Sequence, residues 1–256
     1  LKDKILPFLF SLVYMLAYPL NSVISGFSYL SLALDIIITI LIIVKLEMNV
    51  YYKSILLFFL NFGLYFSYYY FVPVVYLAIF LEILITMKRK KQKILDKESI
   101  ISILFSLFIP GLFGLTFFQI IPLITSNKNP VTSIIGNLGI EGGIYTNLFT
   151  NILIFLVLSI WNFIYKIKNK KIDIMDLTLI LSLIFGITIF IGMKCQIVSE
   201  YYYYKIYYLL WIFLITSAYG GLITIMQKGK LFKIAGYIFF IIYCIGLCIS
   251  ITINKN

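Results

Sequence analysis

The chain has 256 residues, of which 62% are hydrophobic and 12% are charged. A soluble domain is about half apolar and about a quarter charged, so this much apolar surface cannot be buried within a globule of this size and must be covered by lipid. The formal net charge of +11 does not indicate a nucleic-acid-binding protein, because the lysines lie in short loops between apolar runs, as the positive-inside rule describes.

Nine apolar runs predict an all-α, polytopic transmembrane helix bundle of about nine spans. Eight of them cover about residues 5–20, 30–44, 54–69, 99–121, 148–165, 177–193, 201–226 and 234–253, and the fourth ends at residue 87. The segment Tyr68–Pro73 predicts a hairpin at the membrane interface, and Pro110 with Gly111 predicts a kink or a break inside the fifth helix. We expect a single transmembrane domain over residues 1–256.

One long connection, residues 122–147, interrupts this pattern and is rich in glycine. It predicts an external loop with a short interfacial or re-entrant helix, because loops of this length are usually functional or disordered. Glu141 lies beside glycine in this loop. Its carboxylate is a candidate catalytic group that would move with the loop and close over a substrate.

The placement of basic residues predicts how the chain is oriented in the membrane. With a cytoplasmic amino terminus, 17 of the 21 basic residues lie in inner loops, and the densest run covers residues 88–93. This asymmetry orients the chain under the positive-inside rule. Because the inner loops are short, any active surface is expected on the outer face or within the bundle.

The sequence contains few groups that suit metal or nucleophilic chemistry. Histidine is absent, which removes the usual general base and the commonest metal ligand. The three cysteines, Cys195, Cys244 and Cys248, make no disulfide framework, and there is no phosphate-binding loop, zinc motif or nucleophile elbow. We therefore expect no metal and no cofactor.

Residues 199–211, at the start of the eighth predicted helix, combine an acid, a base and six tyrosines. Helical spacing places Lys205 on one face with four aromatic residues, which are Tyr201, Tyr204, Tyr208 and Trp211. We interpret this face as substrate-binding, since an ammonium group suits a phosphate and aromatic rings stack against the apolar faces of sugars. The alternative is an aromatic belt that anchors the helix at the level of the lipid headgroups.

Three carboxylates are candidate catalytic groups, namely Glu200, Asp35 and Glu141. Glu200 lies beside tyrosines on the predicted outer face, where partial burial favours general-base chemistry. Asp35 lies about 8 Å inside the membrane from the outer end of its helix. A charge at this depth is costly, so we expect Asp35 to face the interior of the bundle and to have a partner.

Two segments resemble bacterial envelope glycosyltransferases of the GT-C type and related multi-spanning proteins of Firmicutes. They are Tyr18–Leu30 and Ser199–Trp211, the second with the pattern Ser-x-Tyr-Tyr-x-Tyr-Lys. The chain is similar to the carboxy-terminal part of such a protein. Because it begins with Leu1 and has no signal peptide, we expect it to be a fragment of a longer protein.

The resemblance implies sugar transfer from a polyprenyl-phosphate-linked donor at the outer face of the bacterial plasma membrane, in the synthesis of cell-envelope polysaccharide. In that family the catalytic acid sits in the first external loop, whereas residues 21–29 contain no acid here. No catalytic residue is therefore carried over. Lys205 is carried over as a contact of the donor phosphate, and Asn21, in the polar turn, is a further candidate substrate-binding residue.

Two other classes of protein stay open. Asp35, Glu82 and the interruption at Pro110 also suit a transporter or flippase for a lipid or small polar solute, because interrupted helices often form substrate sites. No inverted repeat is visible in support of that class. A non-enzymatic membrane accessory subunit, which requires only membrane lipid and a protein partner, is the third possibility.

Overall fold

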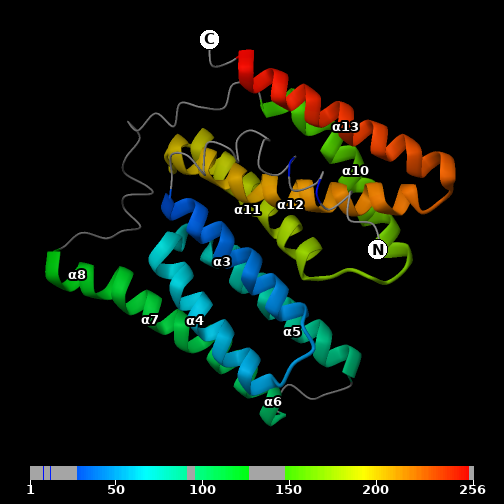
Figure 1. Cartoon of the computed structure of the whole chain (residues 1–256). Helices are drawn as coiled ribbons and strands as arrows, with labels where there is room; N and C mark the ends of the chain where they lie inside the picture. The colour runs from blue at the N-terminus through cyan, green and yellow to red at the C-terminus, as the bar shows by residue number, and fades with distance from the viewer. Residues whose placement is uncertain (1–7, 9–11, 13–27, 91–95, 127–147, 254–256) are drawn as a thin grey trace. The chain divides into compact units, whose positions relative to one another are not determined.

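The computed structural model describes residues 8, 12, 28–90, 96–126 and 148–253, and every element in these ranges is helical (Figure 1). The first predicted span and most of the predicted external loop lie outside the described residues. The helices are α3 (Ser28–Lys45), α4 (Val50–Tyr68), α5 (Val72–Lys90), α6 (Lys97–Ile103), α7 (Ile109–Leu115), α8 (Ile121–Ser126), α10 (Leu148–Lys168), α11 (Ile174–Lys194), α12 (Glu200–Met226) and α13 (Lys230–Ile253).

Five stretches of the described chain are long and apolar enough to cross a membrane. They are Ser28–Lys45, Val50–Arg89, Lys97–Leu115, Ile174–Lys194 and Glu200–Met226. The all-helical class is confirmed, and these stretches are compatible with a multi-pass membrane protein. The count of nine spans and the cytoplasmic amino terminus stay predictions, as does the single domain.

The predicted hairpin between α4 and α5 is confirmed. Tyr68 leaves the helical region with φ −161° and ψ 86°, and a short 3₁₀ turn follows. The rings of Tyr65 and Tyr76 then lie 5.7 Å apart in an edge-to-face contact. In an unbroken helix these residues would be separated by about 16 Å, so the chain reverses between them. Val50–Arg89 is therefore two helices rather than one long helix.

The fifth predicted span forms a series of helical segments in which π-helical turns interrupt the α-helical pattern. Two π-helical segments, Leu104–Phe108 and Thr116–Ile120, separate α6, α7 and α8. Pro110 has no N–H for the Ser106 carbonyl, which lies one turn before it. The side chain of Asn61 on α4, which is fully buried, donates to that carbonyl at 2.6 Å instead. A neighbouring helix thus supplies the hydrogen bond that proline removes, as membrane proteins require.

The chain divides into two compact units, and α12 contributes to both. Unit 1 comprises residues 1–28, 145–172 and 210–256, and unit 2 comprises residues 29–144 and 173–209. In unit 1, Gly221 lies against α10 so closely that a Cβ atom there would be 2.1 Å from the Leu158 carbonyl oxygen. Gly220 and Gly221 thus permit close helix contact, as in the small-residue interfaces of membrane helices.

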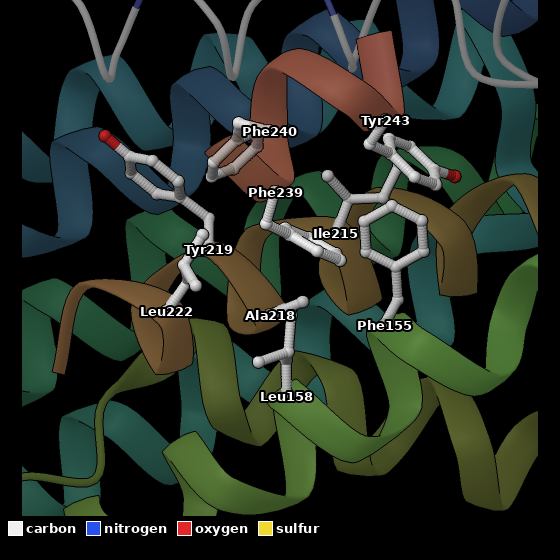
Figure 2. A pocket seen from close by; sticks show the side chains of 9 residues that line it. All are labelled: Phe155, Leu158, Ile215, Ala218, Tyr219, Leu222, Phe239, Phe240 and Tyr243. Atoms are coloured by element: carbon white, nitrogen blue, oxygen red, sulfur yellow. The ribbon is translucent and has the colours of Figure 1, made fainter. Parts of the chain in front are cut away.

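Hydrogen bonds from polar side chains stabilise this contact between α10 and α12. The Ser159 hydroxyl donates to the Leu214 carbonyl at 2.9 Å, and the Asn162 amide donates to the Ser217 hydroxyl at 3.2 Å. Both pairs advance in the same direction along the chain, so the two helices run parallel in unit 1. Beside them is a small hollow closed by α13, in which Phe155, Phe239 and Tyr243 meet (Figure 2). Its lining is almost wholly apolar, which suits packing rather than chemistry.

Candidate functional site

The helices of unit 2 have two chemically different ends. At one end, α3 finishes at Lys45, whose ammonium group pairs with the Asp173 carboxylate at 2.7 Å. Asp173 also caps α11, because it accepts from the N–H groups of Met175 at 3.0 Å and Asp176 at 3.3 Å. Lys53, in the first turn of α4, donates to the carbonyl of Val44, near the end of α3, at 3.1 Å. The start of α4 therefore lies at this same end of the unit. The direction of the helices therefore gathers basic loops at one end of the unit.

The opposite end of unit 2 is built from tyrosines, and we call it the tyrosine end. It consists of Tyr29, Tyr68, Tyr70, Tyr201 and Tyr202. The hydroxyls of Tyr29 and Tyr201 lie 3.3 Å apart in a hydrogen bond, and the Tyr70 hydroxyl donates to the Tyr202 carbonyl at 2.9 Å. The Tyr68 ring contacts the rings of Tyr29 and Tyr70, with centroids 5.7 and 5.8 Å away. Four segments, from α3, α4, the hairpin turn and α12, thus meet here.

Lys205 is buried next to the tyrosine end. Only 3% of its surface is exposed. Its ammonium nitrogen lies 4.9 Å from the centre of the Tyr201 ring and 5.4 Å from that of Tyr208. Both rings come from α12 itself, one turn before and one turn after the lysine. Because a buried ammonium group loses its hydration, the negative faces of two aromatic rings offset part of that cost.

Glu200 lies at the first residue of α12 and is exposed. Its carboxylate accepts a hydrogen bond from the Tyr204 hydroxyl at 2.6 Å. Ser199, directly before it, is buried, and its hydroxyl accepts from the Tyr201 N–H at 3.3 Å. The serine therefore caps the helix, and the acid is held by a tyrosine one turn further along rather than by a cation.

The predicted substrate-binding face is only partly assembled. Tyr201, Lys205 and Tyr208 come together as predicted. Tyr204 instead turns towards Glu200 and towards the ring of Tyr203, which lies 5.5 Å from its own. Trp211 lies in unit 1, where it is 2% exposed and packs edge-to-face on Phe155 at 5.5 Å. Its side chain therefore takes part in packing, and the assignment of Tyr204 and Trp211 to substrate binding stays a prediction.

The remaining predicted site residues do not join this group. Asp35 is exposed on α3, and within the described part of the chain it forms no ion pair. The expectation that it faces the bundle interior was wrong, because the buried stripe of α3 runs through Leu34, Ile37 and Leu41 instead. Glu141 and Asn21 lie outside the described residues, so their assignments stay predictions. In the parts of the chain that are described, no cluster of three or more His, Cys, Asp or Glu side chains is suited to a metal ion.

Sequence reasoning missed the partners that complete the tyrosine end. Tyr29 and Tyr70 are 172 and 132 residues away from the α12 residues that they contact. The run of tyrosines at 68–70 marked a hairpin at an interface, but nothing in it indicated which distant segment would pack there. Asn61 was missed for a similar reason. Two features of the sequence could have indicated its role: it is a single amide within an apolar run, and a proline lies in the middle of another predicted helix.

The described part of the chain is all-helical and compatible with a multi-pass membrane protein, and its unit 2 has one end rich in tyrosine and one rich in lysine. The chain matches no protein-family model, no curated protein and no solved structure.

Proposed function

We propose that the chain is a membrane-embedded, glycosyltransferase-like protein that binds a polyprenyl-phosphate-linked sugar at the tyrosine end of unit 2. The observation that carries the proposal is Lys205, a lysine 3% exposed between the rings of Tyr201 and Tyr208. A buried ammonium group is a strong partner for a phosphate in a site that excludes water. The tyrosine rings around it offer surfaces for a sugar ring and for a lipid chain.

The position of Glu200 supports a transfer reaction at the same end of the unit. It begins the helix on which Lys205 lies, and its exposed carboxylate can accept the proton of an acceptor hydroxyl. The acceptor oxygen would then attack the anomeric carbon as the bond to the phosphate oxygen breaks. Lys205 would balance the charge that develops on the leaving phosphate. The ordered N-terminus of α12, capped by Ser199, also favours an anion nearby.

The substitution Lys205→Met tests the phosphate contact. It removes the charge and keeps most of the buried volume, so we expect the affinity for a polyprenyl phosphate to fall by about tenfold or more, as expected for loss of a charge-assisted hydrogen bond. The measurement is a titration of purified protein in nanodiscs with the phosphorylated lipid. Lys194→Met is the matched control, because Lys194 also lies over an aromatic ring, that of Phe190 at 5.6 Å, but is exposed.

The transfer step is tested separately in cells. Glu200→Gln keeps the shape of the side chain and its ability to accept from Tyr204, but removes the base. We expect envelope glycan to be lost while binding of the lipid phosphate persists. Unchanged glycan with both Glu200→Gln and Lys205→Met, in protein that is correctly inserted, would contradict the transferase proposal. Equal affinities for the Lys205→Met and Lys194→Met proteins would contradict the phosphate site itself.

A transporter or flippase is the second candidate, and the interrupted helix from α6 to α8 favours it. Two π-helical segments flank Pro110, and π-helical turns recur at functional sites. Interrupted helices of this kind often line substrate paths in transporters. Flux of a lipid or sugar in proteoliposomes would support this candidate, and absence of any flux would remove it.

A further inference from the structure

One end of unit 1 carries a concentration of lysines. The residues that follow α10 and join α12 to α13 lie together there, because α10 and α12 run parallel and α13 begins directly after α12. Gly236 on α13 packs against Met226, the last residue of α12. The basic end of unit 1, as we call it, contains seven lysines, which are Lys166, Lys168, Lys170, Lys171, Lys228, Lys230 and Lys233. All but Lys166 are exposed.

An exposed aromatic side chain lies next to a lysine at this end, as is common where membrane helices meet the lipid headgroups. Trp161 is 38% exposed, and its indole N–H donates to the Thr224 hydroxyl at 3.2 Å. The ammonium nitrogen of Lys228 lies over the Trp161 ring, 4.3 Å from its centre. A tryptophan that is exposed at the end of an apolar helix and touched by a lysine is placed where acyl chains give way to headgroups.

The backbone of Lys170 makes this position suitable for testing the role of its charge. The helix α10 ends in a turn in which Lys171 N–H donates to the Lys166 carbonyl at 2.9 Å and Lys170 N–H donates to the Ile167 carbonyl at 3.0 Å. This turn places Lys170 in the left-handed region, with φ 53°. Glycine is the favoured residue at such a position. Replacing Lys170 by glycine therefore removes one charge without a cost in backbone conformation.

We propose that the basic end of unit 1 binds the headgroups of anionic phospholipids in the surrounding bilayer. Charge complementarity carries the choice of partner, since seven lysines lie directly beyond helix ends that are themselves apolar, and the Asp173 carboxylate that follows Lys171 in the chain pairs with Lys45. Basic clusters next to membrane helices are attracted to anionic lipid, with a gain of about fivefold in affinity for each lysine near the surface. The helix carbonyls at the ends of α10 and α12 hold the lysines nearby through their partial negative charge.

Trp161 provides a local probe for the test. The chain has two tryptophans, and the other, Trp211, is buried at 2% exposure. Purified full-length chain in neutral detergent is titrated with phosphatidylglycerol carrying brominated acyl chains, which quench tryptophan on contact. Brominated phosphatidylcholine serves as the uncharged reference. We expect phosphatidylglycerol to quench at a several-fold lower mole fraction, and we expect added salt to reduce the difference because it screens exposed charges.

Two substitutions separate a role in lipid binding from a role in folding. Lys170→Gly is expected to raise the thermal midpoint, because it relieves the left-handed backbone, and to weaken phosphatidylglycerol binding by about fivefold. Gln196→Gly is the matched control. Gln196 has φ 59° in the same kind of turn, with Ile197 N–H donating to the Gly192 carbonyl at 2.8 Å. It is expected to raise the midpoint and leave lipid binding unchanged.

The substitution Lys228→Gln completes the set, since it removes the cation nearest to the probe and is expected to weaken phosphatidylglycerol binding by a similar factor. Equal quenching by the two brominated lipids would overturn the proposal. A preference for phosphatidylglycerol that survives both Lys170→Gly and Lys228→Gln would overturn it as well. Neither result bears on Lys205, which lies in unit 2.

Discussion

Gly221→Ala is expected to destabilise the protein by about 3 kcal/mol or more, which is the upper end of the cost of overpacking a well-packed contact. The added Cβ atom would lie 2.1 Å from the carbonyl oxygen of Leu158 and 3.3 Å from the Cβ atom of Asn162. The first of these is a backbone atom, so no rotation of a side chain relieves the overlap. The helices α10 and α12 must separate, and the hydrogen bonds of Ser159 and Asn162 are then strained or lost.

Gly63→Ala is the matched control for this prediction. Gly63 lies inside α4, and its added Cβ atom would meet only the end of the Ile36 side chain at 3.5 Å. Alanine forms helix better than glycine by about 1 kcal/mol, so this variant is expected to be as stable as the parent or more so. Thermal unfolding of both variants in detergent, followed by circular dichroism, gives the comparison. Equal midpoints for the two variants would contradict the close contact at Gly221.

Asn61→Leu is expected to destabilise the protein by about 1–3 kcal/mol, because it leaves the buried Ser106 carbonyl without a donor. The side chain of Asn61 donates to that carbonyl at 2.6 Å, and both residues are fully buried. The donor is needed only because Pro110 lacks an N–H. In a Pro110→Ala background the helix itself supplies the hydrogen bond, so Asn61→Leu should then cost less by about 1 kcal/mol or more.

A double-mutant cycle over the four proteins measures this coupling. The free energies of unfolding are taken for the parent, Asn61→Leu, Pro110→Ala and the double variant under one set of detergent conditions. A coupling energy near zero would show that Asn61 acts in some other way than by replacing the hydrogen bond. Ser54→Ala is a useful reference, since Ser54 is buried on the same helix but its hydroxyl has no hydrogen-bond partner in the described part of the chain.

The helices could be predicted from the sequence because each apolar run is too long for a strand and is bounded by charged or tyrosine-rich residues. The run at 30–44 became α3 and the run at 177–193 became α11, each extended by a few residues. The start of α11 was placed late because Asp173 forms a capping box with Asp176, which begins the helix before the apolar run does. Near Pro110 the structure has a π-helical segment and a hydrogen-bond donor from another helix, neither of which the sequence indicated, and the predicted kink stays a prediction.

The candidate site was less predictable, because helical spacing describes one helix and the site depends on several. Spacing correctly grouped Lys205 with Tyr201 and Tyr208, which are neighbours on the same helix. It also grouped Trp211, although that residue packs on Phe155 from α10. For Asp35 the cost of a charge in lipid argued for burial, but the direction of its side chain is set by Leu34 and Ile37, which occupy the buried stripe.

The tyrosine end has a consequence for how the protein is made. Its hydrogen bonds join Tyr29 and Tyr70 to α12, which leaves the ribosome long after α3, α4 and α5 have been synthesised. Those early helices therefore lack their α12 partners while α10, which belongs to unit 1, is being synthesised and inserted. Both units need α12, so a nascent chain stopped before Glu200 would expose tyrosine hydroxyls and apolar surface to quality-control proteases.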